Sequence, residues 1–407
     1  MRSEVLVRRI SRAIVRRQLR THLAGVEGLH HLPTTGSFVL VPNHRSYFDH
    51  FVMELLVGAA VGRPVWFLTK QESFERPLSR VWTKAWYGIP VERDRPSPGT
   101  LRAVQAVFAA DEVLCVYPEG TRNATDEMLP FQAGAFRFAL TAGVPIIPVA
   151  LTGTESVLPK GSRRFRREGR VRVAFGAPIV PDLAGGKQRA AQRLATETRA
   201  AITALLATDW RAADGSAAPR ALDDLVTAAL DPAGRLAVAD ERRLRFVLRL
   251  MSSSHARPAD IEVQHARLRG LAILRRPAPL RALPALVVRR RLERVLRADP
   301  EHSLANYLLA RWHLAMPAAL GGDSTSAEQL FSRSAQAATE GDTRALSGLV
   351  ELQLGNGRVD AARETLRRIA DAPAVVGSRA EARATRARLQ LVTLADLADP
   401  SPSGVLA

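Results

Sequence analysis

The alternation of strand-like and helix-like segments between residues 37 and 209 constrains the fold more than any other feature of the sequence. Short apolar runs are typical of buried strands, and longer segments with helical spacing separate them. The expected strands are residues 37–42, 65–69, 89–91, 113–117, 144–151 and 171–175. The expected helices are residues 47–60, 74–87, 101–110, 134–142 and 188–207. This order predicts a layered α/β domain, which we place at residues 21–210.

A change in composition separates this domain from the rest of the chain. Residues 211–219 (RAADGSAAP) are small or polar and lack periodicity, which predicts a linker. Residues 220–398 lack strand signals and are rich in Ala, Leu and Arg at helical spacing. They predict an all-α domain, followed by a tail at residues 399–407.

Two stretches of the helical domain resemble pairs of tetratricopeptide helices. Small residues such as Ala310, Ala361 and Ala362 stand where such helices cross. The stretches are residues 292–315, continued by 327–338, and residues 345–373. The insertion 316–326 breaks the ~34-residue period of these repeats. We therefore expect a helical-repeat domain that offers a surface to a protein partner, with a generic Ala-rich bundle as the alternative.

The N-terminal segment, residues 1–20, predicts a basic amphipathic helix. It contains seven arginines and one glutamate. Leu6, Ile10, Ala13 and Ile14 fall on one helical face, and arginines occupy most of the remaining surface. This pattern is typical of a helix in a membrane interface whose cationic side chains meet anionic headgroups. A surface helix packed on the domain is the alternative.

The charge and the cysteine content limit the classes of partner and the cellular compartment that we expect. The net charge of +18 favours an anionic partner, such as anionic lipid, an acidic carrier protein or nucleic acid. No groove-reading or base-stacking motif supports nucleic acid. The single cysteine, Cys115, excludes a disulfide framework and a multi-cysteine zinc site. No apolar run reaches the ~18 residues that span a bilayer, and no secretory signal is present. We expect a peripheral protein on the cytoplasmic face of a membrane.

His44 and Asp49 form the strongest chemical motif (NHRSYFD), at the junction of an expected strand and helix. A histidine is the side chain best suited to accept a proton near neutral pH. A carboxylate five residues later can hold the imidazole by its second nitrogen. Ser46 and Asp49 also have the spacing of a capping box, so Asp49 could instead only cap the helix.

Of three further blocks, two follow expected strands and one lies within a strand. Glu119-Gly120-Thr121-Arg122 comes directly after residues 113–117, and Arg93 follows residues 89–91. Glycine permits close approach of the backbone to a ligand, and arginine offers a fork of donors to phosphate oxygens. The fourth block, VPIIPV at residues 144–149, is apolar and fits a strand. Ligands in open α/β sheets bind beyond the carboxyl ends of strands, so His44, Arg93 and Glu119 are expected to converge.

These four blocks, in this order, resemble those of the 1-acyl-sn-glycerol-3-phosphate acyltransferases and related glycerolipid acyltransferases, over roughly residues 20–210. His44 and Asp49 match the His-x4-Asp motif of that family, and Arg93 its second-motif arginine. Residues 119–122 match its Glu-Gly-Thr-Arg motif, and Pro148 falls in its fourth block. Tyr117 and Asn123 depart from the usual phenylalanine and serine. These departures leave the acceptor open.

The resemblance implies an enzyme of phospholipid biosynthesis that uses no cofactor and no metal. It implies that His44, oriented by Asp49, deprotonates the hydroxyl of a lysophospholipid acceptor, which attacks the thioester of acyl-CoA or an acyl carrier protein. Arg93 and Arg122 would seat the acceptor phosphate, beside Glu119, Gly120 and Thr121.

Three alternatives stay open at the level of sequence. The acceptor could be a different lysolipid or a glycolipid. The chain could be a helical-repeat scaffold with a vestigial catalytic domain, although the intact motifs argue against this. The basic cluster at residues 160–170 (KGSRRFRREGR) could bind headgroups, coenzyme A phosphates or an acidic carrier, or could be a solvated hairpin.

Overall fold

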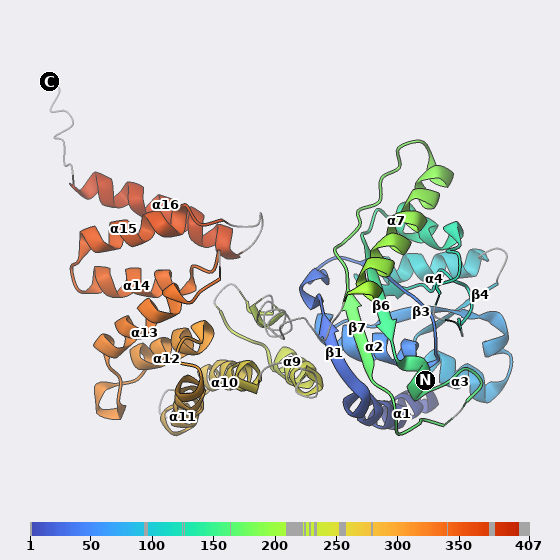
Figure 1. Ribbon diagram of the computed structural model, residues 1–407, viewed down its shortest axis with the longest axis horizontal. Helices are drawn as coiled ribbons and strands as arrows, with labels where there is room; N and C mark the ends of the chain where they lie inside the picture. Colours follow the sequence, from blue (N-terminus) through green and yellow to red (C-terminus); the bar gives the residue numbers. More distant parts are fainter. Residues whose placement is uncertain are drawn as a thin grey trace. The chain divides into compact units, whose positions relative to one another are not determined.

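The chain forms two compact units, Met1–Gln264 and His265–Ala407. The computed structural model, shown in Figure 1, describes residues 2–92, 97–123, 125, 127–162, 164–208, 223, 225–227, 229–231, 234–251, 258–277, 280–339, 341–373 and 379–398. The expected linker 211–219 and tail 399–407 lie outside the described residues.

A seven-stranded sheet with the order β1-β7-β6-β2-β5-β3-β4 forms the centre of the first unit. Neighbouring strands are parallel except for β6 and β7. The strands are β1 (Leu23–Glu27), β2 (Phe38–Pro42), β3 (Val65–Lys70), β4 (Gly88–Val91), β5 (Val113–Cys115), β6 (Ile146–Thr152) and β7 (Val171–Phe175). This mixed α/β sheet confirms the predicted fold class.

Helices cover the sheet in two layers (Figure 1). One layer contains α4 (Pro98–Ala109), α5 (Arg137–Ala142) and α7 (Lys187–Ala207), whose apolar residues pack with Val39 and Leu114 of the central strands. Successive side chains of a strand point to opposite faces, so Leu40 and Cys115 point to the other layer. That layer includes α2 (Phe48–Val61), which packs on β3.

The second layer is extended by helices from both ends of the unit. The helix α1 (Arg2–His22) contacts α2, α3 (Pro77–Ala85) and α9 (Val238–Met251). α9 packs on α2 and on β1, and Leu244, Val247 and Leu248 are buried in that contact layer. The first compact unit therefore includes residues beyond the boundary that we expected near residue 210.

Some arginines of helix α1 do not face outward, although the membrane interpretation of this helix expected them to. Arg8 donates to the carbonyl of Ala85, Arg12 pairs with the buried Glu54, and Arg16 lies over the ring of Phe246. Arg8 and Arg12 are therefore directed toward protein, and Arg12 balances a buried carboxylate. The exposed surface of α1 carries an apolar stripe, formed by Val5, Leu6, Ile10 and Ile14, together with the exposed Arg9, Arg16, Arg17 and Arg20.

Some elements differ from the expected ones. The strand β1 was missed, because it follows α1 without a break and contains Gly25 and Glu27, which are unfavourable in strands. The expected helix 74–87 divides into a 3-10 turn, Gln71–Phe74, and α3, which begins at Pro77. Proline favours the first turn of a helix, so the break at that residue has a local cause.

The second unit is helical throughout its described part. Consecutive helices from α11 to α16 pack on one another, with Phe331 and Leu366 in their shared core. The helices are α11 (Ala282–Ala298), α12 (Ser303–Ala315), α13 (Ser324–Gln336), α14 (Arg344–Gly355), α15 (Val359–Ala370) and α16 (Arg379–Ala398), preceded by α10 (Pro258–Leu274). Ala310 and Ala362 are buried as expected, but Ala361 is exposed. The tetratricopeptide resemblance stays a prediction.

Candidate active site

The loop between β2 and α2 holds the predicted base and its carboxylate together. His44 Nδ1 lies 2.9 Å from Asp49 Oδ2. The same oxygen accepts hydrogen bonds from the backbone N–H groups of Arg45, at 2.7 Å, and Ser46, at 2.8 Å. Asp49 is fully buried. The carboxylate therefore fixes the imidazole and the loop at once.

Asp49 also holds the backbone before α2. Phe48 N donates to Ser46 Oγ at 2.9 Å, while Ser46 N donates back to Asp49. These bonds are not the reciprocal capping box that the sequence predicted, because Ser46 Oγ accepts from Phe48 N rather than from Asp49 N, and the N-cap of α2 is Tyr47, without a side-chain cap. Asp49 forms only the carboxylate half of that motif, beside its contact with His44. Because Nδ1 faces the carboxylate, the Nε2 atom of His44 is the nitrogen left to accept a proton.

Glu119 joins the loop after β5 to the His44 loop. One carboxylate oxygen accepts from His44 N at 2.7 Å, and the other accepts from Leu129 N at 3.0 Å. β2 and β5 are parallel neighbours, so the residues after them meet at one edge of the sheet. The structure thus brings His44 and Glu119 together as expected. The partners of the Glu119 carboxylate here are backbone amides, and its contact with an acceptor stays a prediction.

The rest of the Glu-Gly-Thr-Arg block surrounds this junction. Gly120 has φ +67°, in the left-handed region that favours glycine over other residues. Thr121 is exposed. The Arg122 guanidinium lies 3.5 Å over the ring of Tyr47, and its Nη1 atom is buried without a hydrogen-bond partner in the described structure. Arg93 lies outside the described residues.

Tyr117 contacts the candidate base directly, a role that the sequence analysis missed. Its ring stacks on the His44 imidazole, with 3.9 Å between centroids and 23° between planes. Burial raises the pKa of Tyr117 well above its ordinary value, and the nearby Cys115 and Asp49 add to this rise. The sequence shows only that Tyr117 replaces the usual phenylalanine of the family. The stacking on His44 depends on tertiary structure, so the sequence could not predict it.

Two buried asparagines hold the loop between β2 and α2 in place. Asn43 pairs with Leu151 of β6 through both its amide oxygen and its amide nitrogen, at 2.7 and 2.9 Å. Asn123 N donates to His44 O at 2.7 Å. Beside them is a cavity of about 210 Å³, whose lining residues are Asn43, Arg45, Glu119, Asn123, Thr125, Met128, Thr152 and Leu206.

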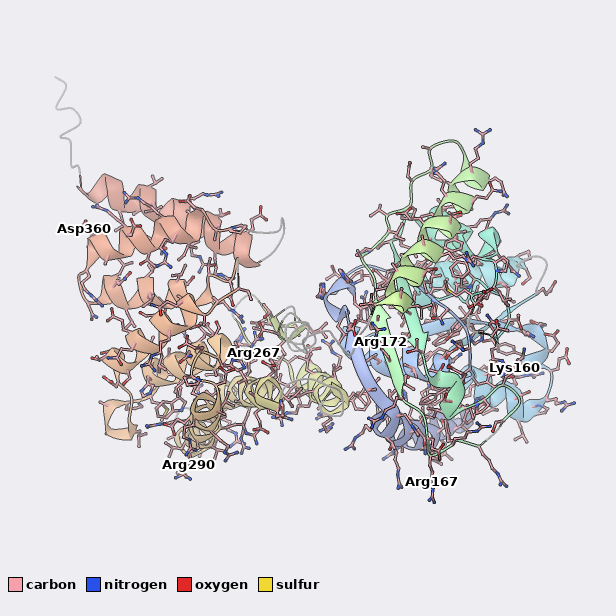
Figure 2. All side chains as sticks on the ribbon, in the orientation of Figure 1. Lys160, Arg167, Arg172, Arg267, Arg290 and Asp360 are labelled. Carbon is pink, nitrogen blue, oxygen red and sulfur yellow. The ribbon has the colours of Figure 1, made fainter. Side chains whose placement is uncertain are left out.

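The basic cluster at residues 160–170, together with the preceding Leu158, lies against the site. Ser46 Oγ donates to the carbonyl of Leu158, and Phe165 packs edge-on against Phe48. Lys160 Nζ donates to Arg122 O at 3.1 Å. Figure 2 shows Arg167 extending away from the ribbon. The segment therefore packs on the His44 loop at its base, while Arg167 extends outward.

Cys115 is unsuited to act as the nucleophile. It is fully buried in β5, and burial raises the pKa of its thiol well above the ordinary value. A thiol must ionise to react well. Within the part of the chain that the structure describes, no three His, Cys, Asp or Glu side chains lie together as a metal site would require.

Comparisons with known proteins find relatives of the first unit. Residues 24–152 match the family described as Acyltransferase. The chain is 34% identical over 160 residues to the 1-acyl-sn-glycerol-3-phosphate acyltransferase alpha of Mus musculus, which covers 38% of this chain and 54% of the relative. It is 26% identical over 148 residues to the 1-acyl-sn-glycerol-3-phosphate acyltransferase of Bacillus subtilis. This match covers 36% of this chain and 69% of the relative.

A solved structure also matches. It is the 1-acyl-sn-glycerophosphate acyltransferase PlsC from Thermotoga maritima, with 22% identity, coverage of 49% of this chain and 82% of that chain, and a TM-score of 0.39. The chain spans about half the length of the first curated relatives it matches, 54% and 44%. Residues 24–152 place a domain of the acyltransferase family in the first unit of this protein.

Proposed function

We propose that this protein transfers a fatty acyl group from a thioester to the free hydroxyl of lysophosphatidic acid or a similar glycerolipid. The observation that carries the proposal is the His44–Asp49 contact of 2.9 Å at the carboxyl end of a central strand. The names of the matched relatives support the reaction class and the acceptor.

The proposed reaction is a direct transfer with His44 as general base. His44 Nε2 removes the proton of the acceptor hydroxyl while Asp49 stabilises the imidazolium that forms. The acceptor oxygen attacks the thioester carbonyl, and the tetrahedral intermediate collapses with loss of the thiolate. The proton from His44 then passes to the thiolate, so that ester and free thiol are released. The acyl donor is acyl-CoA or an acyl carrier protein, and no cofactor is needed.

Arg122 is the proposed seat for the acceptor phosphate, together with Arg93. The buried Nη1 atom of Arg122 has no hydrogen-bond partner within the described residues, which supports an anionic ligand at this position. Its face is held by the Tyr47 ring, so its edge is oriented for bidentate contact. Glu119, Gly120 and Thr121 complete the proposed acceptor site beside it.

The acceptor is a lipid, so we propose that the protein binds the cytoplasmic face of an anionic membrane. The apolar stripe of α1 is exposed, with Leu6 at 59% and Ile10 at 56%. Helix α3 packs on α1 and adds Leu78 and Trp82, which are also exposed. Tryptophan favours the headgroup region. Among the described residues, no helix combines the length and apolarity needed to cross a bilayer.

An acyl-transfer assay of the purified full-length protein tests the function. The protein is incubated with acyl-CoA or acyl carrier protein thioester and a panel of lysolipids, and products are identified by mass spectrometry. We expect transfer to lysophosphatidic acid, lost in His44→Ala. Arg122→Ala should weaken use of phosphorylated acceptors most, because it removes a charged hydrogen bond worth about 1.5–3 kcal/mol. Transfer at an unchanged rate in folded His44→Ala would exclude the proposed mechanism.

A further inference from the structure

The exposed face of α11 combines apolar and cationic side chains on one stripe. Leu283 and Val287 lie on one stripe with Arg290, Arg294 and Arg297, since steps of three and four residues return to the same side of a helix. The opposite side of α11 is buried, as shown by Ala285, Val288, Leu292 and Val295. We call the five-residue stripe the α11 face.

The α11 face is apolar at one end and cationic at the other. Leu283 is 78% exposed and Val287 41%, and the exposed Leu280 extends the apolar end. Arg290, Arg294 and Arg297 are exposed, and Figure 2 shows Arg290 pointing away from the helix. The single acidic residue of α11, Glu293, is engaged by Arg289 at 2.6 Å. The three arginines of the face form no ion pair within the described residues.

We propose that the α11 face binds an acidic amphipathic helix of a partner protein. α11 has 17 residues and is about 25 Å long, enough for a four-turn partner helix. Apolar side chains of the partner cover Leu283 and Val287, and Asp or Glu side chains pair with the arginines of the next turns. Exposed leucines and unpaired guanidinium groups are the two features that such a partner would satisfy.

The distribution along the helix favours a protein over a membrane. A helix that lies in a lipid interface needs an apolar stripe along its whole length, with cations at the sides. On α11 the apolar residues occupy the first turns and the arginines the last turns of the same stripe. A partner helix with separate apolar and acidic ends matches this order, whereas a uniform anionic surface does not.

Peptide selection on the full-length protein tests this proposal. A displayed library of random 17-residue peptides, the length of α11, is selected for binding. We expect enriched peptides with apolar residues near one end and Asp or Glu at helical spacing near the other. Binding of the synthetic peptides, measured by fluorescence anisotropy, should weaken at least about tenfold in Arg290→Glu/Arg294→Glu/Arg297→Glu, because close charge pairs contribute more than 1.4 kcal/mol.

A matched control separates the α11 face from general charge. Arg333→Glu/Arg368→Glu/Arg386→Glu changes the net charge equally at exposed positions of α13, α15 and α16, and should change binding less than about twofold. If the charge reversal disturbs folding, Leu283→Ser/Val287→Ser provides a neutral variant that should also weaken binding. The proposal is overturned if no acidic peptide is enriched, or if both triple variants lose binding equally. It is also overturned if the α11 variants lose only binding to phosphatidylglycerol vesicles.

Discussion

Two proposed roles of Asp49, orienting His44 and holding the backbone before α2, can be separated by mutation. Loss of a helix cap costs about 1 kcal/mol of stability, whereas loss of a general base or its orienting group costs ~10²–10⁴ in rate. Asp49→Asn keeps an acceptor for the N–H groups of Arg45 and Ser46 but cannot stabilise an imidazolium as a carboxylate does. We expect Asp49→Asn and His44→Ala to stay folded and to lose at least ~100-fold in turnover.

The double variant sharpens this prediction. If the two residues act as a unit, as we propose, His44→Ala/Asp49→Asn should be little slower than His44→Ala alone. Thermal melting and turnover are measured on the same preparations. Independent, multiplicative losses would show that Asp49 acts separately from His44.

Stacking by Tyr117 predicts a split between two substitutions. Tyr117→Phe keeps the ring against His44 and removes only a buried hydroxyl, whose neighbour, the Cys115 thiol, is a weak partner. We expect turnover within about threefold of wild type. Tyr117→Leu removes the flat surface that fixes the imidazole plane, and roughly tenfold slower turnover should follow from misplacement of the base. Equal effects of both substitutions would assign the role to the hydroxyl instead.

His50 predicts a pH dependence of stability. Burial lowers its pKa to about 4, while its Nε2 atom lies 2.9 Å from Trp86 O and its ring stacks on Phe67. In the unfolded chain the histidine pKa is about 6.5. The unfolded state therefore binds the additional proton between these values, and stability falls as pH decreases from about 6.5 to 4. The loss reaches up to about 3 kcal/mol.

Urea unfolding at several pH values measures this slope. His50→Gln keeps a donor for the Trp86 carbonyl and does not titrate in this range, so its stability should depend less on pH between about 6.5 and 4. An unchanged pH slope in His50→Gln would place the titrating group elsewhere in the chain.

At the scale of elements, α1 directs Arg8 and Arg12 toward protein and exposes an apolar stripe beside other arginines. Replacement of Leu6, Ile10 and Ile14 by Ser should release the protein from phosphatidylglycerol vesicles in co-sedimentation, because it removes the apolar surface that enters the interface. The unfolding free energy should change little, since these residues are exposed. Persistent binding of this variant at low salt would exclude the α1 stripe as the membrane anchor.

Arg12 supplies the contrasting control within the same helix. It pairs with Glu54, which is 1% exposed and whose pKa is raised by burial. Arg12→Ala leaves that carboxyl buried without its cation, and we expect a loss of about 3–5 kcal/mol in stability. Vesicle binding by the molecules that remain folded should persist.

The same elements show which features could be predicted from sequence and which could not. Alternating patterns predicted the central strands, and the parallel order of β2 and β5 explains why His44 and Glu119 meet. The hydrophobic pattern of α1 predicted an amphipathic helix, but not that Arg12 would turn inward. That orientation depends on Glu54, 42 residues away in the chain. Likewise, the stack of Tyr117 on His44 depends on strand order, which local sequence patterns do not contain.

At the scale of the whole molecule, α9 connects residues beyond the expected linker to the acyltransferase-family domain. Arg243 donates to the carbonyls of Ala59 and Ala60 at the end of α2, where a cation also complements the helix dipole. Arg16 of α1 lies over the ring of Phe246. These contacts give α9 a structural role in the first unit, although all predicted catalytic residues precede it.

Truncation tests how much of the chain that unit needs. From sequence alone, a fragment of residues 1–214 should fold and keep activity. The structure changes this expectation, because removal of α9 uncovers the surface that Leu244, Val247 and Leu248 bury, at roughly 1.5–3 kcal/mol for each side chain. We now expect residues 1–214 to melt well below the full chain or to aggregate. Residues 1–257 keep α9 and omit only the last part of the first unit, residues 258–264, so this fragment should melt closer to the full chain than residues 1–214 do. Turnover per folded molecule should be similar in both fragments, since His44, Glu119 and Arg122 are retained.

A fragment 1–214 that is as stable as 1–257 would show that α9 contributes nothing to the first unit. Loss of turnover in a stable 1–257 fragment would instead show that the second unit takes part in the reaction.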